Sequence, residues 1–442
     1  MVHDRTIKPR SIHAGGIPGH GWPGYNPIMQ LKRTVGVGGA VLLGLGSIVG
    51  TGIFVSIGLV AEAAGPSVLL AVLIAAGVAT ANGLNSAQLA AAHPVSGGSY
   101  EYGYHYLNPA LGFTAGWTFL LAKTASAATA ALGFAGYLMA AIGFSGRWTR
   151  TAIAGAAVIA LTALVLSGLR RSNWLNGLLV LLGCGALLTF VVVGATRAST
   201  AAFIPFMEGG VPGLLEAAAL AFVAYTGYGR IATMGEEIRE PQRNIPRAMI
   251  VTLVVSAVIY AAVAAVLIGL GGQIVQGAPL VGASRYSRPV AWIVAQGAMV
   301  AMLGVLLNLV LGLSRMWLAM GRRRDMPRVL AKVNVSGTTP VPAVILTGVM
   351  IGALVLVGDV KKTWSFSAFT VLVYYAITNA AALCLPAEQR RYPRWVAGVG
   401  LASCLFLAFW VEWKVWAVGL AIIVAGLVWH LIAQRRSLRT PI

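Results

Sequence analysis

Charged residues are scarce in this sequence, and acidic ones are scarcer still. Only 10% of the 442 residues are charged and only 12 are Asp or Glu, whereas 58% are hydrophobic. A typical soluble domain has about 25% charged residues, and a chain this apolar has too little polar surface to face water on every side. The composition therefore excludes a soluble protein and predicts an all-α integral membrane protein.

Cysteine is also rare. The three cysteines, Cys184, Cys384 and Cys404, lack the paired spacing of a metal site or of a disulfide framework. We interpret them as small packing residues, and we expect neither a metal nor a cofactor. Residues 1–34 lack the apolar core of a cleavable signal peptide, so we expect a cytoplasmic N-terminal tail there.

The apolar stretches also lack the residue patterns of other functional classes. Their polar residues form no acid–base or metal cluster, which argues against an enzyme. No ring of charged residues recurs along them, which argues against a channel. The net charge of +20 suggests nucleic acid, but anionic lipid explains basic residues that flank apolar segments better. We therefore expect a lipid bilayer, and no nucleic acid, as the partner.

Long apolar runs make up most of the chain. Windows of about 20 apolar residues give about twelve transmembrane segments, so we expect residues 35–433 to form one transmembrane domain, followed by a cytoplasmic tail at 434–442. The segments lie near residues 35–61, 66–92, 109–142, 151–169, 173–196, 214–235, 247–270, 289–320, 341–358, 364–386, 395–411 and 413–433.

Basic residues alternate between rich and poor connections. The rich connections include Arg170 and Arg171, Arg322 to Arg324, and Arg390 and Arg391, whereas the poor ones include Arg147, Arg150, Lys361 and Lys362. By the positive-inside rule, the rich connections and both termini are cytoplasmic. We expect a multi-pass protein of the cell membrane, of the bacterial inner-membrane type.

Two glycine-rich breaks interrupt apolar segments. The first is residues 46–52 (GSIVGTG) and the second is residues 222–229 (FVAYTGYG). Backbone can unwind at membrane depth only where it lines a protein-enclosed cavity. Paired breaks in corresponding halves of a chain indicate the substrate site of a secondary transporter. The alternative is a packing face of small residues.

The positions of the breaks predict a five-plus-five arrangement. Repeat one would cover residues 35–196 and repeat two residues 214–386, each opening with a broken helix, and helices eleven and twelve would follow at 395–433. At a break, backbone N–H groups favour a carboxylate and unpaired carbonyl groups favour an amine. The pair of breaks therefore suits a zwitterion.

Four motifs identify a family resemblance. Residues 31–33 with 46–54, residues 94–100 with Gly112, Gly116 and Trp117, residues 236–246 and residues 314–327 resemble signatures of the amino acid/polyamine/organocation superfamily. Within it, the chain is similar to bacterial amino acid permeases related to cationic amino acid transporters. The resemblance runs from about Leu31 to Leu385 and implies a leucine-transporter-like inverted repeat with helices one and six broken.

The resemblance also implies a substrate site. The carboxylate of an amino acid would meet the backbone of Ser47, Ile48, Val49, Gly50, Thr51 and Gly52, and its amine would meet carbonyl groups near Phe222, Val223 and Tyr225. Thr226 belongs to the same break, and Tyr225 and Tyr228 would cover the substrate or, alternatively, pack in the core. Arg230, Glu236 and Glu237 are candidates for a cytoplasmic gate, with a solvated loop as the alternative.

The coupling ion is where the sequence departs from relatives. Residues 298–305 (AMVAMLGV) lack the hydroxyl groups with which sodium-coupled relatives bind Na⁺, and Gly183 aligns where some proton-coupled relatives have a lysine. Lys123 is the only lysine deep in a segment, and burying its charge costs about 2.5 to 3.5 kcal/mol. It is our candidate for proton coupling, the alternative being a lysine directed into a water-filled vestibule.

The sequence allows two predictions for the charge of the substrate's side chain. No acidic residue is evident in the central segments to balance a cationic side chain, and Lys123 and Arg230 are basic. We therefore expect a neutral amino acid, although the resemblance also allows a cationic amino acid or a polyamine. A non-transporting amino acid sensor on the same fold is the alternative of a different class.

Overall fold

Helices account for most of the described chain. The computed structural model describes residues 35–95, 97–168, 173–232, 237–271, 275, 277–334 and 339–437, with the side chains of 173–176 and 435–437 excepted. The predicted tail at 1–34, the gate candidate Glu236 and the last five residues lie outside these ranges. In the described residues, the only strand-like pairing is an isolated parallel bridge between Val35 and Ile238.

Each of the twelve predicted segments is helical. The first six comprise α1 (Val37–Ile48), a π-helical turn (Gly52–Ser56), α2 (Ile57–Ala64), α3 (Val68–Ala92), α5 (Pro109–Ile142), α6 (Arg147–Leu166), α7 (Asn173–Ala195), α8 (Gly210–Tyr225), a 3-10 turn (Thr226–Tyr228) and α9 (Gly229–Ala232). The last six comprise α10 (Pro241–Gly269), α12 (Arg288–Arg323), α13 (Val341–Val357), α14 (Val360–Leu383), α15 (Arg394–Ala408) and α16 (Trp413–Ser437). The short helices α4 (Ser99–Tyr106) and α11 (Pro279–Ala283) lie in connections.

Length and composition define the candidate membrane spans. Nine stretches of the described residues are long and apolar enough to cross a bilayer, and the first of them, Val37–Ala92, covers two of the predicted segments. The helices Val341–Val357 and Arg394–Ala408 are apolar but shorter. The protein is therefore a multi-pass membrane protein with an all-helical architecture.

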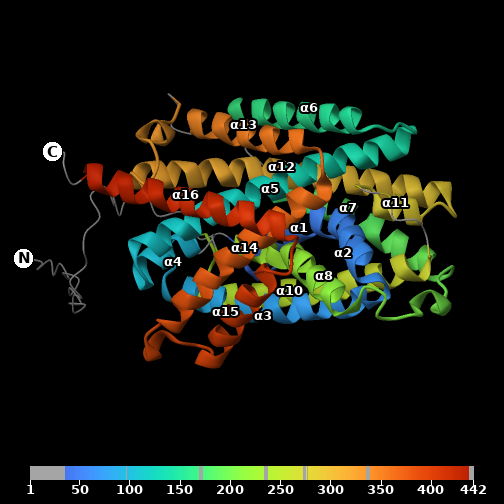
Figure 1. Cartoon of the computed structure of the whole chain (residues 1–442), viewed down its shortest axis with the longest axis horizontal. Coiled ribbons are helices and arrows are strands. Elements are labelled where there is room, and N and C mark those ends of the chain that lie inside the picture. Colours follow the sequence, from blue (N-terminus) through green and yellow to red (C-terminus); the bar gives the residue numbers. More distant parts are fainter. Residues whose placement is uncertain are drawn as a thin grey trace, which may run out of the picture.

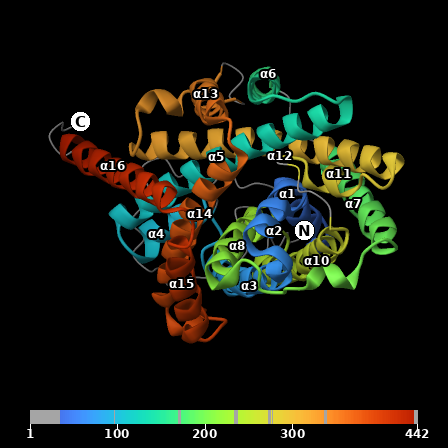
Figure 2. The ribbon, with the colours of Figure 1, turned by 45° about the vertical axis from the view of Figure 1, so that its right-hand side comes forward.

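The helices form two groups. In Figures 1 and 2, α1, α2, α3, α8 and α10 cluster together, whereas α5, α6, α12 and α13 form a second layer, and contacts between α3 and α10, between α3 and α8, and between α5 and α12 follow this division. Helix α14 contacts both α5 and α3 and so joins the two groups. The first group contains both broken helices, which places the candidate site inside it and next to the second group.

Helix α6 begins earlier than predicted. It starts at Arg147 rather than at 151, because the hydropathy window excluded Arg147 and Arg150, whose long side chains can lie at the end of a membrane helix with their charges directed to the interface. These two arginines are therefore residues of the first helical turns and not of a loop. This placement matters for the pocket described below.

A buried carboxylate anchors the end of α12. Asp325 accepts hydrogen bonds from the hydroxyl groups of Tyr100 at 2.5 Å and Tyr104 at 2.8 Å, both on α4. From α16, His430 Nδ1 lies 3.3 Å from the same carboxylate, and Trp429 Nε1 donates to the Asp325 carbonyl at 3.1 Å. Three segments far apart in the sequence are thus joined at one end of the molecule.

Candidate functional site

The first helix breaks at Val49 and Gly50. Helix α1 ends at Ile48, and Val49 has an extended backbone with ψ of 92°. The next half-helix begins with hydrogen bonds from the amides of Ile53 and Phe54 to the Gly50 carbonyl, at 3.2 and 3.0 Å. The N–H groups ahead of that first turn belong to a helix N-terminus, where backbone donors lack helical partners and the dipole favours an anion.

One buried side-chain oxygen at this break has no partner. Thr51 is 4% exposed, and its Oγ1 makes no hydrogen bond with any described residue. By contrast, the neighbouring Ser47 hydroxyl donates to the Leu43 carbonyl at 3.0 Å, one turn back along α1. A buried hydroxyl without a partner costs about 1 to 3 kcal/mol, which a polar ligand group could recover.

The second break is a 3-10 turn. Helix α8 ends at Tyr225, Thr226–Tyr228 form the turn, and α9 follows from Gly229. The two breaks touch at glycines. A Cβ atom added at Gly52 would lie 2.9 Å from the Ala224 Cβ, and one added at Gly227 would lie 2.6 Å from the Ser47 carbonyl carbon. Only glycine permits this approach of two backbones.

A tyrosine on α10 bridges the two breaks. The Tyr260 hydroxyl lies 3.1 Å from the Ile48 carbonyl oxygen and 3.0 Å from the Ala224 carbonyl oxygen. A single O–H can donate to one of these acceptors at a time, so the bridge can alternate between the two helices. Tyr260 is fully buried, and its ring lies 4.9 Å from that of Tyr225.

Other carbonyl groups of the second broken helix are also satisfied by the chain itself. Trp364 Nε1 donates to the Leu220 carbonyl at 3.0 Å, and the Thr226 hydroxyl donates to the Val223 carbonyl at 2.7 Å. The Tyr375 hydroxyl reaches the Thr226 carbonyl at 3.4 Å. A carbonyl oxygen has a second lone pair, so these groups can still accept from a substrate amine, but they do not lack a donor.

Lys123 lies at the second break. Its Nζ donates to the Thr226 hydroxyl oxygen at 3.0 Å from α5, which belongs to the other helix group. None of the described acidic residues forms an ion pair with it. An ammonium group has three donors, and one of them is directed at the turn where the substrate amine was expected.

The aromatic residues of the second break lie against neighbouring helices. The Tyr225 hydroxyl donates to the Val72 carbonyl of α3 at 3.3 Å. Phe222 and Tyr228 both contact the ring of Tyr375, at 5.7 and 5.5 Å between ring centroids. These aromatic residues therefore pack against α3 and α14, and Tyr375 of α14 contacts two of them.

The other side of the first break is apolar. A Cβ atom added at Gly50 would lie 2.5 Å from Val305 Cγ2 of α12, and one at Gly183 would lie 3.5 Å from Val49 Cγ1 and 3.6 Å from the Ala301 Cβ. Gly183 of α7 therefore lies between the first break, which follows α1, and α12. Side-chain oxygen ligands are absent from these five residues, so a hard cation would have only backbone carbonyl groups to bind there.

Of the gate candidates, Arg230 lies on α9 and Glu237 lies in the connection after it, whereas Glu236 is outside the described residues. The Val35 amide donates to the Glu237 carbonyl at 3.1 Å, and the Arg239 amide donates to the Val35 carbonyl at 2.9 Å. The start of helix one is thereby joined to the loop after helix six by backbone groups. An Arg230 guanidinium nitrogen comes within 3.7 Å of a Cβ position at Gly312 of α12.

Sequence reasoning missed Tyr260 and Tyr375. Both are tyrosines inside long apolar helices, α10 and α14, and a buried tyrosine hydroxyl usually finds a partner. That signal shows that a polar contact exists, but it does not identify the partner. Tyr260 contacts Ile48 across 212 residues and Ala224 across 36, and Tyr375 contacts Thr226 across 149.

Comparison with known proteins agrees with this geometry. A family model described as amino acid permease matches residues 36–432. An uncharacterized transporter of Mycobacterium bovis is 42% identical over 422 residues, which cover 93% of this chain and 94% of the relative. The branched-chain amino acid permease BcaP of Bacillus subtilis is 29% identical, with coverages of 92% and 94%.

A plant relative named for another substrate class matches less of its own length. The vacuolar cationic amino acid transporter 2 of Arabidopsis thaliana is 26% identical over 397 residues, which cover 82% of this chain and 62% of the relative. The matches, together with two broken helices that meet inside an all-helical membrane protein, assign the chain to one family. It belongs to the amino acid permease family of the amino acid/polyamine/organocation superfamily, and it is an amino acid transporter rather than an enzyme.

Proposed function

We propose that this protein is a secondary active transporter of neutral amino acids that works by alternating access. The contact between the two breaks carries this proposal, because a helix N-terminus with an unpartnered buried hydroxyl at Thr51 faces a turn with several carbonyl groups. The substrate carboxylate would bind at residues 47–52. The amine would bind near residues 222–226.

The position of Lys123 supports a neutral side chain. Its ammonium group is 3.0 Å from Thr226, and a second cation held next to it without a carboxylate would be repelled. A relative named for branched-chain amino acids supports the same class. The relative named for cationic amino acids supports the alternative, in which arginine, lysine or a polyamine is carried.

Coupling to protons is proposed through Lys123. Burial disfavours the charged form of a lysine, and a cavity that opens to alternate sides changes that burial during each cycle. Helices α1, α2 and α3 group with α8 and α10, and α5 and α6 group with α12 and α13. These are the first and second predicted segments with the sixth and seventh, and the third and fourth with the eighth and ninth. This grouping supports a repeat of five helices. Rocking of one group against the other would then expose the site to each side.

The deciding experiment is uptake by proteoliposomes. Each of the twenty amino acids and a polyamine would be tested with and without an imposed pH gradient, at constant ionic strength. We expect concentrative uptake of one or more neutral amino acids that increases with the pH gradient. Uptake of lysine or arginine alone would favour the cationic alternative, and specific binding without any uptake or exchange would indicate a sensor.

A further inference from the structure

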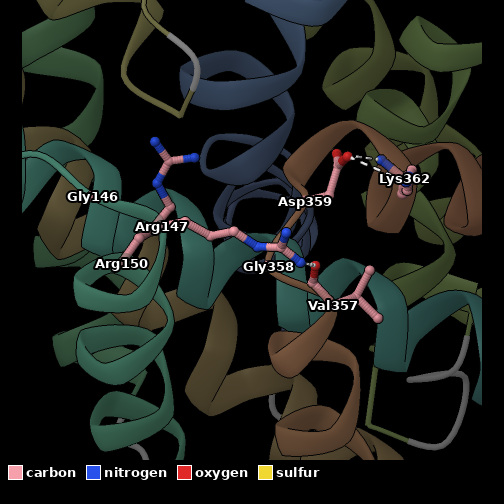
Figure 3. A pocket seen from close by; sticks show the side chains of 7 residues that line it. All are labelled: Gly146, Arg147, Arg150, Val357, Gly358, Asp359 and Lys362. Carbon is pink, nitrogen blue, oxygen red and sulfur yellow. Dashed lines mark hydrogen bonds and ion pairs between the residues drawn. The ribbon is translucent and has the colours of Figure 1, made fainter.

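A polar pocket lies at one end of the second helix group, and none of the residues of the two breaks lines it. It has a volume of about 360 Å³ and is lined by Gly146, Arg147, Arg150, Val357, Gly358, Asp359 and Lys362. Figure 3 shows that the lining comes from two places, the start of α6 and the connection from α13 to α14. The start of α6 and this connection face each other across the pocket.

Positive charge predominates in this pocket. Arg147, Arg150 and Lys362 line it together with one acidic residue, Asp359. The Asp359 carboxylate is already engaged, because its Oδ1 accepts from the Lys362 amide at 3.0 Å and its Oδ2 lies 3.9 Å from Lys362 Nζ. The neighbouring Lys361 pairs with Glu216 at 3.2 Å and is not part of the lining.

The two arginines differ in their contacts. Arg147 Nη2 donates to the Val357 carbonyl at 3.0 Å (Figure 3) and so holds the two loops together. Arg150 is half-buried, and its Nε is shielded from solvent without a hydrogen bond to any described residue. A shielded guanidinium donor without an acceptor is a group that a bound anion would satisfy.

Helix dipoles add to the positive potential. Helix α6 has 20 residues and begins at Arg147, and its N-cap, Gly146, supplies no side-chain cap. Helix α14 has 24 residues and begins beside the pocket at Val360. Each N-terminus carries a partial positive charge. The Asp359 carboxylate caps that of α14, so it is the uncapped N-terminus of α6 that reinforces the cationic side chains.

Exposed aromatic residues place the pocket at the membrane interface. Trp148 is 75% exposed and Phe144 is 64% exposed, and both lie next to the lining residues in the sequence, where the candidate spans Pro109–Ile142 and Arg147–Leu166 end and begin. Tryptophan at a span end is typical of the headgroup level of a bilayer. A ligand in the pocket would therefore lie among lipid headgroups.

We propose that this pocket binds a phosphate-bearing anion, and that an anionic phospholipid is its source. Arg150 and Lys362 bind the phosphate oxygens with charge-assisted hydrogen bonds, as basic pockets between membrane helices bind lipid headgroups. Arg147 keeps the loops in register. Trp148 and Phe144 contact the glycerol and the first acyl carbons.

The test uses the full chain in detergent and native mass spectrometry. Phosphatidylglycerol would be titrated against the unchanged protein and against the double variant Arg150→Gln, Lys362→Gln. The control is Arg285→Gln, Lys414→Gln, which removes the same charge at exposed positions outside the pocket. We expect the pocket variant to bind phosphatidylglycerol about tenfold or more weakly, and the control to bind it as the unchanged protein does.

A competition arm identifies the source of the phosphate. Glycerol 3-phosphate and zwitterionic phosphatidylcholine would each be added to the phosphatidylglycerol complex. Failure of both to displace the lipid supports an anionic-lipid site. If glycerol 3-phosphate displaces the lipid from the unchanged protein but not from the pocket variant, the result supports the pocket with a soluble anion as its ligand. Equal lipid binding by the pocket variant and the control, with no soluble anion bound, would overturn the proposal.

Discussion

The two broken helices differ in how far the chain satisfies its own backbone. At the second break, the carbonyl groups of Leu220, Val223 and Ala224 each accept a hydrogen bond from a side chain. At the first break, the Thr51 hydroxyl has no partner in the described chain, and the amides before Ile53 precede the first helical hydrogen bond. The backbone of the first break is therefore the less satisfied of the two.

This difference suggests a division of roles between the breaks. The first break offers donors that only a ligand can satisfy, so it is suited to fix the common carboxylate of amino acids. The second break has carbonyl groups that already accept from side chains, and it carries the Lys123 ammonium group, so a substrate amine there must share acceptors with Thr226 and Tyr260. Competition of this kind links substrate binding to the positions of side chains on α5 and α10.

The largest effect is expected at Gly50. In Gly50→Ala, the added Cβ would lie 2.5 Å from Val305 Cγ2, and overpacking of this kind costs about 1 to 3 kcal/mol. We expect initial uptake to fall by about tenfold or more, and Val305→Ala in the same chain to restore most of it. Gly185→Ala, on an exposed face of α7 with open space at its Cβ, is the control and should transport normally.

That pair of variants tests the comparison itself. If Val305→Ala fails to restore uptake while the double variant folds and inserts normally, the methyl group added at position 50 blocks the ligand directly. The loss of uptake would then not be caused by a clash with α12. The unsatisfied surface of the first break would then extend to the side that faces Val305.

Lys123→Ala should have the next largest effect. Removing the ammonium group at Thr226 should abolish accumulation driven by a pH gradient while leaving equilibrium exchange within about twofold of normal, since the backbone groups of both breaks remain. Concentrative uptake and exchange would be measured in one liposome preparation. Retention of both activities would show that Lys123 does not couple transport to protons.

Tyr260→Phe should have a moderate effect. It removes the hydroxyl shared by the Ile48 and Ala224 carbonyl groups and should lower stability by about 1 to 3 kcal/mol, with a further loss of uptake rate. Tyr137→Phe is the control, because the Tyr137 hydroxyl donates to one carbonyl, that of Phe54 at 2.6 Å, and does not join the two breaks. If uptake slows in both variants in proportion to their loss of stability, the Tyr260 bridge has no role in transport beyond stabilising the fold.

Replacing sodium should have almost no effect. Gly183, Ala301 and Val305, which lie against the first break, have no side-chain oxygen, and Na⁺ prefers several hard ligands. Initial uptake should therefore stay within about 20% when choline replaces sodium at constant pH and ionic strength. A several-fold loss would reveal an ion site elsewhere in the molecule.

The sequence predicted the helices well because span length and apolar runs are local properties. The predicted segment at 109–142 and the helix Pro109–Ile142 coincide, and the first break lies within the predicted 46–52. The directions of side chains were not predictable in the same way. That Gly50 faces Val305, or that Lys123 reaches Thr226 across 103 residues, depends on how the helices are rotated and packed. Sequence spacing alone does not determine this.

The bridge between Val35 and Ile238 has a kinetic consequence. Its two amide protons, on Val35 and Arg239, are held by hydrogen bonds that join the beginning of one broken helix to the loop after the other. If the two helices move as one body, these protons should resist exchange with deuterated water throughout the transport cycle; if the helices separate, both protons should exchange at the rate of that opening. The exchange rate of these two amide protons would thus report how often the two broken helices separate during the transport cycle.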